Sequence, residues 1–258
     1  MGDTATYVYC VVHRNVPVAL RSIPPGIPGA SRPALLDVSP RLWIVASQVT
    51  RAVYTSEEIE RRLRDLDWVA EIALAHELVV ERLSRATGAT VIPMKLFTMF
   101  SAPDRAVADM RSRRRQLEAV VKRIQGCDEW GVRVTRAATA RSTPARTGVV
   151  PSGSAFLAAK KQARDDAREL SARLADAAGD VLTTLGRVAK QSKRRPPPES
   201  AATPPLLEAA FLVPRDRKAR FRTAAKQTAR RCRTMGAELT VTGPWPAYNF
   251  IDDAETRS

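Results

Sequence analysis

The sequence predicts an α+β protein of two domains, on three observations. Its 258 residues exceed the usual single-domain size of roughly 100–150 residues. Segments typical of strands alternate with segments of helical periodicity in both halves. A composition of 44% hydrophobic and 27% charged residues is that of a globular chain with a core. We place the boundary near Cys127, which gives domains 1–127 and 128–258, with the C-terminal tail in the second.

The first half begins with a run that predicts a buried strand. Tyr7–His13 (YVYCVVH) is rich in aromatic and β-branched residues, and a second strand is expected over Leu42–Val49. Thr55 and Glu58 have the spacing of a capping box, in which both side chains satisfy free backbone N–H groups at a helix start. A helix is therefore expected to begin there.

Two helices and a strand complete the first half. Apolar residues of Trp68–Arg85 repeat at helical spacing with His76 on the same stripe, so His76 is expected to be a hydrogen-bonded core residue and not a general base. Ala89–Phe100 is expected to be a strand with Pro93 at an edge or bulge, because proline cannot donate to the ladder. A basic-faced helix follows and ends at Gly126.

The second half predicts strand, helix, strand, helix, strand. This order suits a small split βαβ sheet with helices on one face, and a further short strand could lie in the loops. We expect loops at 138–153 and, mobile and proline-rich, at 192–205. The predicted elements are a strand at Trp130–Val134, a long helix at Phe156–Val188, a strand at Leu206–Val213, a helix at Asp216–Met235 and a strand from Leu239.

The charge of the chain indicates an acidic partner. Lys and Arg outnumber Asp and Glu by 42 to 27, a net charge of +15, which favours contact with nucleic acid, an anionic membrane or an acidic protein surface. Two basic runs, Arg111–Arg115 and Arg215–Arg233, could follow phosphates. Because aromatic residues are scarce near both and no nucleic-acid-binding motif is present, nucleic-acid binding is kept as the alternative function.

Motifs for other chemistry are missing. The sequence has no glycine-rich nucleotide loop and two histidines, and Cys10, Cys127 and Cys232 are too far apart for a zinc site or a disulfide framework. No apolar run approaches the roughly 18 residues of a membrane span, and no export signal is seen. We therefore predict no catalytic residue, cofactor, metal ion or small-molecule substrate, and a reducing compartment.

The C-terminal tail is unusually aromatic. Trp245, Tyr248 and Phe250 lie beside Pro244 and Pro246, which restrict the chain and lower the entropy lost when the rings pack on a surface. That surface is either the core of this protein or a binding partner.

Several blocks together resemble the gas vesicle GvpF/GvpL family. This sequence departs from the family's Pro-x-Arg-Phe-Gly-Thr pattern, since it lacks the glycine in Pro93–Thr98, and Ala247 replaces the second proline of Pro-Pro-Tyr. The departures concern turn geometry and partner preference. The blocks are, in chain order, YVYCVV with the following Gly-Ile-Pro-Gly, WVAEIALAHELVV, VIPMKLFTMF, CDEWGVRV and GPWPAYNF.

The resemblance implies a two-domain α+β protein whose second domain has a modified ferredoxin-like fold. It also implies a non-enzymatic accessory protein, in the cytoplasm or on the vesicle. Such a protein binds the shell protein GvpA and other Gvp accessory proteins and assists vesicle nucleation or assembly, or is a minor wall component. The candidate partner-binding residues are Pro93, Lys95, Phe97, Trp130, Pro244, Trp245, Pro246, Tyr248 and Phe250.

Overall fold

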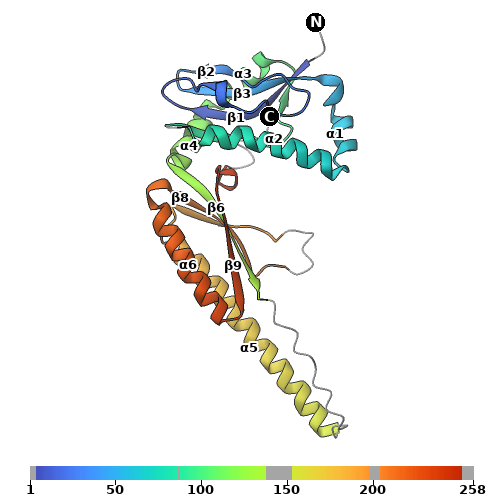
Figure 1. Cartoon of the computed structure of the whole chain (residues 1–258), viewed down its shortest axis with the longest axis vertical. Coiled ribbons are helices and arrows are strands. Elements are labelled where there is room, and N and C mark those ends of the chain that lie inside the picture. Colours follow the sequence, from blue (N-terminus) through green and yellow to red (C-terminus); the bar gives the residue numbers. More distant parts are fainter. Residues whose placement is uncertain (1–3, 87, 138–152, 198–203, 252–258) are drawn as a thin grey trace. The chain divides into compact units, whose positions relative to one another are not determined.

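A computed structural model describes residues 4–86, 88–137, 153–197 and 204–251 (Figure 1). The chain forms two units. The first is Met1–Glu129 together with the segment from Pro244, and the second is Trp130–Gly243. The tail, which is expected in the second domain, belongs to the first unit in the structure, because its polar groups bind residues there.

The first unit contains an antiparallel sheet of order β2-β3-β1-β4, and β5 also pairs with β1. The central strand β1 is buried along almost its whole length, as its aromatic and β-branched composition predicts. Pro93 ends the outermost strand, in agreement with its expected edge position. The strands are β1 (Thr4–His13), β2 (Ala34–Ser39), β3 (Leu42–Thr50), β4 (Thr90–Pro93) and β5 (Met99–Phe100).

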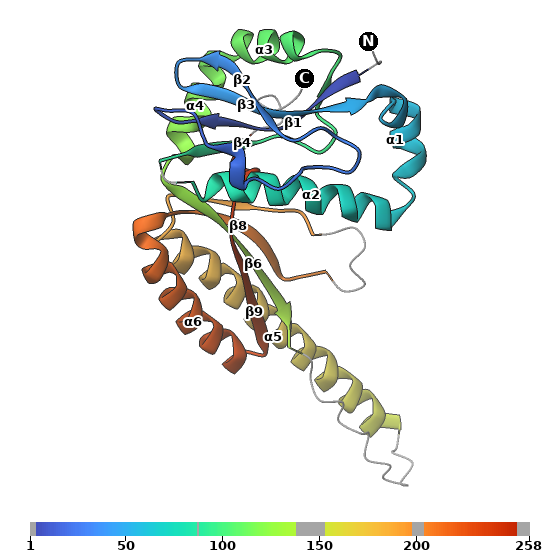
Figure 2. The same ribbon diagram turned by 45° about the horizontal axis from the view of Figure 1, so that its top comes forward.

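Helices cover both faces of this sheet (Figure 2). Helix α2 packs on one face through Ile72, Val79 and Leu83, and α3 and α4 lie on the other. The single helix expected after Ser101 is divided at Arg113, whose backbone leaves the helical region (φ −96°, ψ 11°). The helices are α1 (Ser56–Arg62), α2 (Leu66–Ser84), α3 (Pro103–Ser112) and α4 (Arg114–Ile124).

The second unit has the element order β-α-β-β-α-β, so its sheet contains one strand more than the five predicted elements required. Its sheet has the order β7-β8-β6-β9, and β7 pairs antiparallel with β8. The core joins Trp130 and Phe211 of the sheet to Leu185 and Phe221 of the two helices. The elements are β6 (Cys127–Arg136), α5 (Gly153–Gly186), β7 (Gln191–Arg194), β8 (Leu207–Pro214), α6 (Lys218–Thr234) and β9 (Ala237–Trp245).

Strand β7 corrects the expectation of a mobile loop at 192–205. Its four residues are exposed, so it has no apolar alternation to reveal it in the sequence. Main-chain pairing with β8, extended by Lys190 N donating to Leu212 O at 2.8 Å, is what fixes it. Residues 198–203 and most of the loop expected at 138–153 lie outside the described residues.

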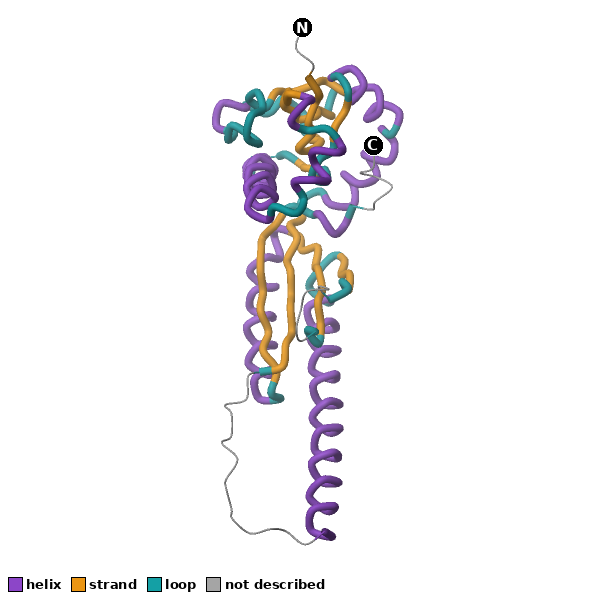
Figure 3. The backbone as a smooth tube through the Cα atoms, turned by 90° about the vertical axis from the view of Figure 1, so that its right-hand side faces the viewer, coloured by secondary structure: helices purple, strands orange, loops and turns teal. Residues whose placement is uncertain are grey.

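Helix α5 matches the long helix expected at Phe156–Val188 and continues through Gly179 without a break. Leu174, Val181 and Leu185 are fully buried in the core of the unit. Lys160–Glu169, in contrast, are exposed at every position. Figure 3 shows this part of α5 extending beyond the strands of its own unit.

Candidate partner-binding surface

Three of the predicted partner-binding residues lie at the end of β4 and in the loop between β4 and β5. Both strands pair with β1, so the chain makes a short detour in which Thr98 N and Oγ1 donate to Lys95 O at 3.2 and 2.8 Å. Pro93 is buried, whereas Lys95 and Leu96 are exposed. All four residues of β4 are buried, whereas both residues of β5 are half-buried.

Phe97 explains the departure from the family pattern. Its φ is +62°, the left-handed region that favours glycine, and it aligns with the glycine of Pro-x-Arg-Phe-Gly-Thr. The ring stacks on Trp68, with centroids 5.6 Å apart and planes inclined by 12°. The turn thus keeps a backbone conformation suited to glycine, and the aromatic contact compensates for part of the strain.

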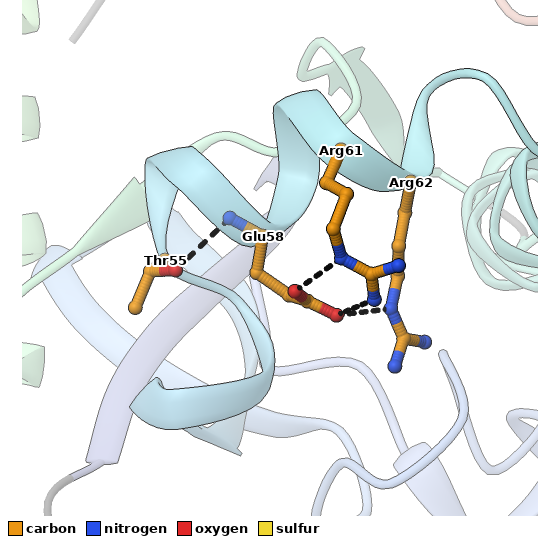
Figure 4. A network of polar contacts seen from close by, with 4 residues as sticks. All are labelled: Thr55, Glu58, Arg61 and Arg62. Carbon is orange, nitrogen blue, oxygen red and sulfur yellow. Dashed lines mark hydrogen bonds and ion pairs between the residues drawn. The ribbon is translucent and has the colours of Figure 1, made fainter.

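Trp68 is supported in turn by helix α1. The Arg62 guanidinium lies 5.4 Å from the Trp68 ring centroid, and Arg62 Nε donates to Glu58 Oε1 at 2.6 Å. Thr55 Oγ1 accepts from Glu58 N at 3.1 Å, which is the first half of the predicted capping box, whereas the Glu58 carboxylate accepts from Arg61 and Arg62 (Figure 4). Hydrogen bonds from Arg61 and Arg62 lower the pKa of the Glu58 carboxyl to about 2. Glu58, in the first turn of α1, thus orients the Arg62 guanidinium that covers Trp68.

The aromatic tail is anchored to the first unit by polar contacts. Tyr248 Oη donates to Glu77 Oε2 at 2.5 Å, and Arg123 Nε donates to Phe250 O at 2.9 Å. Asn249 N and Nδ2 donate to the two carboxylate oxygens of Glu129 at 2.8 and 2.5 Å. Burial raises the pKa values of Glu77 and Tyr248. Most of the tail therefore packs on its own protein.

The remaining candidate partner-binding residues fall into two groups, buried and exposed. Trp130 is buried in the second unit, with its ring centroid 5.6 Å from that of Phe221, and Pro246 and Phe250 are buried in the first. Pro244 is exposed and Trp245 is 42% exposed. A partner can reach the exposed candidates directly, but the buried ones act only by shaping the surface around them.

Helix α2 presents an apolar surface that the sequence analysis missed. We define the leucine ridge as Leu66, Ala70, Leu74 and Leu78, whose spacing of four places them along one line of the helix. Its leucines are 78%, 62% and 43% exposed. The ridge was overlooked because the more regular stripe of Ile72 and Val79 accounts for the core. A helix with apolar residues outside its core stripe is the signal that could have revealed it.

Both candidate segments attach to this helix. Trp68, near its start, holds Phe97, and Glu77, next to Leu78, holds Tyr248. The leucine ridge, the exposed tip at Lys95 and the anchored tail thus belong to one unit and are organised around one helix.

His76, the buried histidine of α2, lies in surroundings that suit a structural residue of the core. His76 Nδ1 lies 2.8 Å from Tyr7 Oη, and burial lowers the pKa of His76 to about 4, an effect that the Met94 main chain partly opposes. Within the described ranges, no group of His, Cys, Asp and Glu side chains could hold a metal ion. The helices of these same ranges are all too short or too polar to cross a membrane.

Comparison with known proteins identifies the family. Residues 5–252 match the family described as gas vesicle synthesis protein GvpL/GvpF. Gas vesicle protein L of Streptomyces sp. (strain CB03234) is 31% identical over 265 residues, which cover 98% of this chain and 95% of that protein. Two solved structures of gas vesicle protein GvpF share the fold at 13% identity. That from Anabaena sp. PCC7120 has a TM-score of 0.68, with 96% of each chain covered. That from Microcystis aeruginosa has a TM-score of 0.66, with 96% of this chain and 99% of the other covered. The chain belongs to the GvpL/GvpF family of gas vesicle accessory proteins.

Proposed function

We propose that this protein is a non-enzymatic assembly factor that binds the shell protein GvpA and other Gvp accessory proteins. It acts in the cytoplasm or on the vesicle, assisting nucleation or assembly, or it becomes a minor wall component. Membership of the GvpL/GvpF family supports a gas vesicle role. The leucine ridge is the observation that supports binding, because three leucines on one exposed helix face are available to a partner.

The proposed mechanism is a reversible cover for apolar surface. Shell subunits that are not yet assembled expose apolar surface that would aggregate, and the leucine ridge covers it until the subunit joins the wall. Complete burial of one leucine side chain is worth roughly 1.5–3 kcal/mol. A few such side chains give a contact that is strong enough to hold a subunit and weak enough to release it.

A pull-down with the double variant Leu74→Gln/Leu78→Gln tests this function. Glutamine keeps the helix propensity, so the variant removes apolar surface with little effect on folding. We expect capture of purified GvpA to fall by about tenfold or more. The matched control is Phe156→Gln/Leu157→Gln, which removes two exposed apolar side chains from α5 of the second unit. Equal capture by the wild type and the ridge variant would show that the ridge is not the binding surface.

The distribution of charge favours a second candidate, binding of nucleic acid by the second unit. Trp130–Gly243 contains 23 Lys and Arg against 9 Asp and Glu, whereas the rest of the chain contains 19 against 18. Phosphate contacts weaken steeply with salt, whereas apolar contacts do not. DNA binding that is lost as salt increases, without capture of any Gvp protein, would favour this alternative.

A further inference from the structure

A basic pocket in the first unit lies between a turn and a helix. It has a volume of about 480 Å³ and is formed by the β2–β3 turn on one side and α4 on the other. A volume of this size is in the usual range for small-ligand sites, roughly 300–1,000 Å³. Its lining is mainly polar: His13, Ser39, Pro40, Arg41, Leu42, Arg114, Glu118, Val121, Lys122 and Gln125.

Three cations surround one carboxylate in this pocket. Arg114 Nε donates to Glu118 Oε1 at 2.8 Å. That hydrogen bond, followed by the charges of Arg114, Lys122 and Arg41, lowers the pKa of Glu118. The charged residues that line the pocket are thus Arg41, Arg114 and Lys122 against Glu118.

The adjoining arginines serve other contacts. Arg111 Nε donates to Val38 O at 3.0 Å and so attaches α3 to β2, and Arg113 forms an ion pair with Asp109. A second hollow, lined by Arg111–Gln116 and Glu118, shares Arg114 and Glu118 with the pocket. Positive charge therefore continues from the pocket along the start of α4.

We propose that this pocket binds a compact multivalent anion of the phosphate class, which replaces Glu118 as the partner of Arg114. Three converging cations suit a group with several terminal oxygens, and guanidinium groups bind such oxygens in pairs. His13, Ser39 and Gln125 add polar groups at the wall. Among the described residues, no Phe, Tyr or Trp lines the pocket, and the charged groups outnumber the single imidazole of His13, so the phosphate group is the part of a ligand that this lining recognises best.

The shape of the pocket favours a small anionic ligand over an acidic polypeptide. An extended peptide requires a long groove or a free strand edge, whereas this pocket is confined between one turn and one helix. The phosphate could be free or part of a lipid headgroup. The proposal is independent of the proposed function, since it concerns a different surface of the first unit.

Isothermal titration of the whole protein with pyrophosphate tests the proposal. Arg41→Ala/Lys122→Ala removes two exposed cations of the pocket, and we expect affinity to fall by about tenfold or more. The matched control, Arg222→Ala/Lys226→Ala, removes the same charge from exposed positions of α6 and should bind as the wild type does. Glu118→Gln should strengthen binding, because Arg114 is then released from its internal partner.

Sedimentation with phosphatidylcholine vesicles, with or without phosphatidic acid, separates the two sources of phosphate. Capture that requires phosphatidic acid and is lost in Arg41→Ala/Lys122→Ala identifies a headgroup, and pyrophosphate binding alone identifies a free ligand. Absence of binding to both probes overturns the proposal. Equal weakening by the pocket and control variants also overturns it, because binding then reflects net charge. So does an unchanged or weaker affinity in Glu118→Gln.

Discussion

The two units of this protein are stabilised in different ways. Six of the buried polar or charged residues lie in the first unit, among them Ser47, His76 and Glu129, whereas Thr228 is the one found in the described part of the second. The second unit instead combines an apolar core with a strongly basic surface. The stability of the first unit therefore depends on satisfied polar groups as well as packing, and that of the second mainly on packing.

The largest expected effect is the loss of a core ring in the second unit. Phe221→Ala removes a fully buried side chain that contacts Trp130 and Phe211. Such a change costs about 3–5 kcal/mol. Hydrogen exchange should show faster opening of α6 and β8 with little change in β1. Phe156→Ala, at an exposed position, is the control, and a similar loss there would contradict the packing argument.

The next effect is a pH dependence confined to the first unit. The pKa of His76 is about 4 in the fold, below its ordinary value near 6.5, so the unfolded chain binds the extra proton between these values. Stability from this group is complete above pH ~6.5 and is lost as pH falls towards ~4, by about 3 kcal/mol.

Hydrogen exchange at pH 7 and at pH 5 measures this dependence in each unit. Exchange of β1 and α2 should accelerate at the lower pH relative to that of β8 and α6. His76→Gln should flatten the difference. An equal change in the protection of both units between pH 7 and pH 5 would mean that His76 is not the group responsible.

A smaller effect is expected from the tail anchor. Glu129→Gln replaces one of the two carboxylate oxygens that accept from Asn249 N and Asn249 Nδ2 with an NH2 group, so one Asn249 donor loses its acceptor and the other loses a charged one. A buried donor that is left without an acceptor lowers the free energy of unfolding by about 1–3 kcal/mol. Urea unfolding measures the loss, and limited proteolysis near Trp245 should become faster. If cleavage there were unchanged, Glu129 would not be holding the tail.

The smallest expected effect is a reversal of the usual order of stability between an alanine variant and a glycine variant. Alanine normally stabilises a chain more than glycine does, but at Phe97 φ is positive. We therefore expect Phe97→Gly to be more stable than Phe97→Ala by about 1 kcal/mol. Thermal unfolding of the two variants decides this, since both lose the Trp68 stack equally. The opposite order would show that the turn relaxes when the ring is removed.

Local patterns in the sequence predicted much of the fold. The aromatic and β-branched run of β1, the Thr55 side chain that caps α1 and the periodicity of α5 each have a local physical cause, and each was confirmed. Strand β7 was missed because an exposed edge strand is fixed by main-chain pairing and not by its side chains.

The candidate surface was harder to predict than the fold. The tail is held by Glu77 and Glu129, which are 171 and 120 residues from their partners, and no local pattern connects them. The leucine ridge was missed because exposed apolar residues have no periodicity requirement of their own. The basic pocket depends on a turn and a helix that meet only in the folded unit.

The return of the chain to its first unit also bears on how the protein is made. A ribosome releases the segment from Pro244 only after all of Trp130–Gly243 has been synthesised. Until then Glu77 and Glu129 lack the tyrosine and asparagine that bind them. All of the second unit is therefore synthesised before the segment that completes the first unit. A nascent chain therefore completes its first unit only after Tyr248 and Asn249 have left the ribosome.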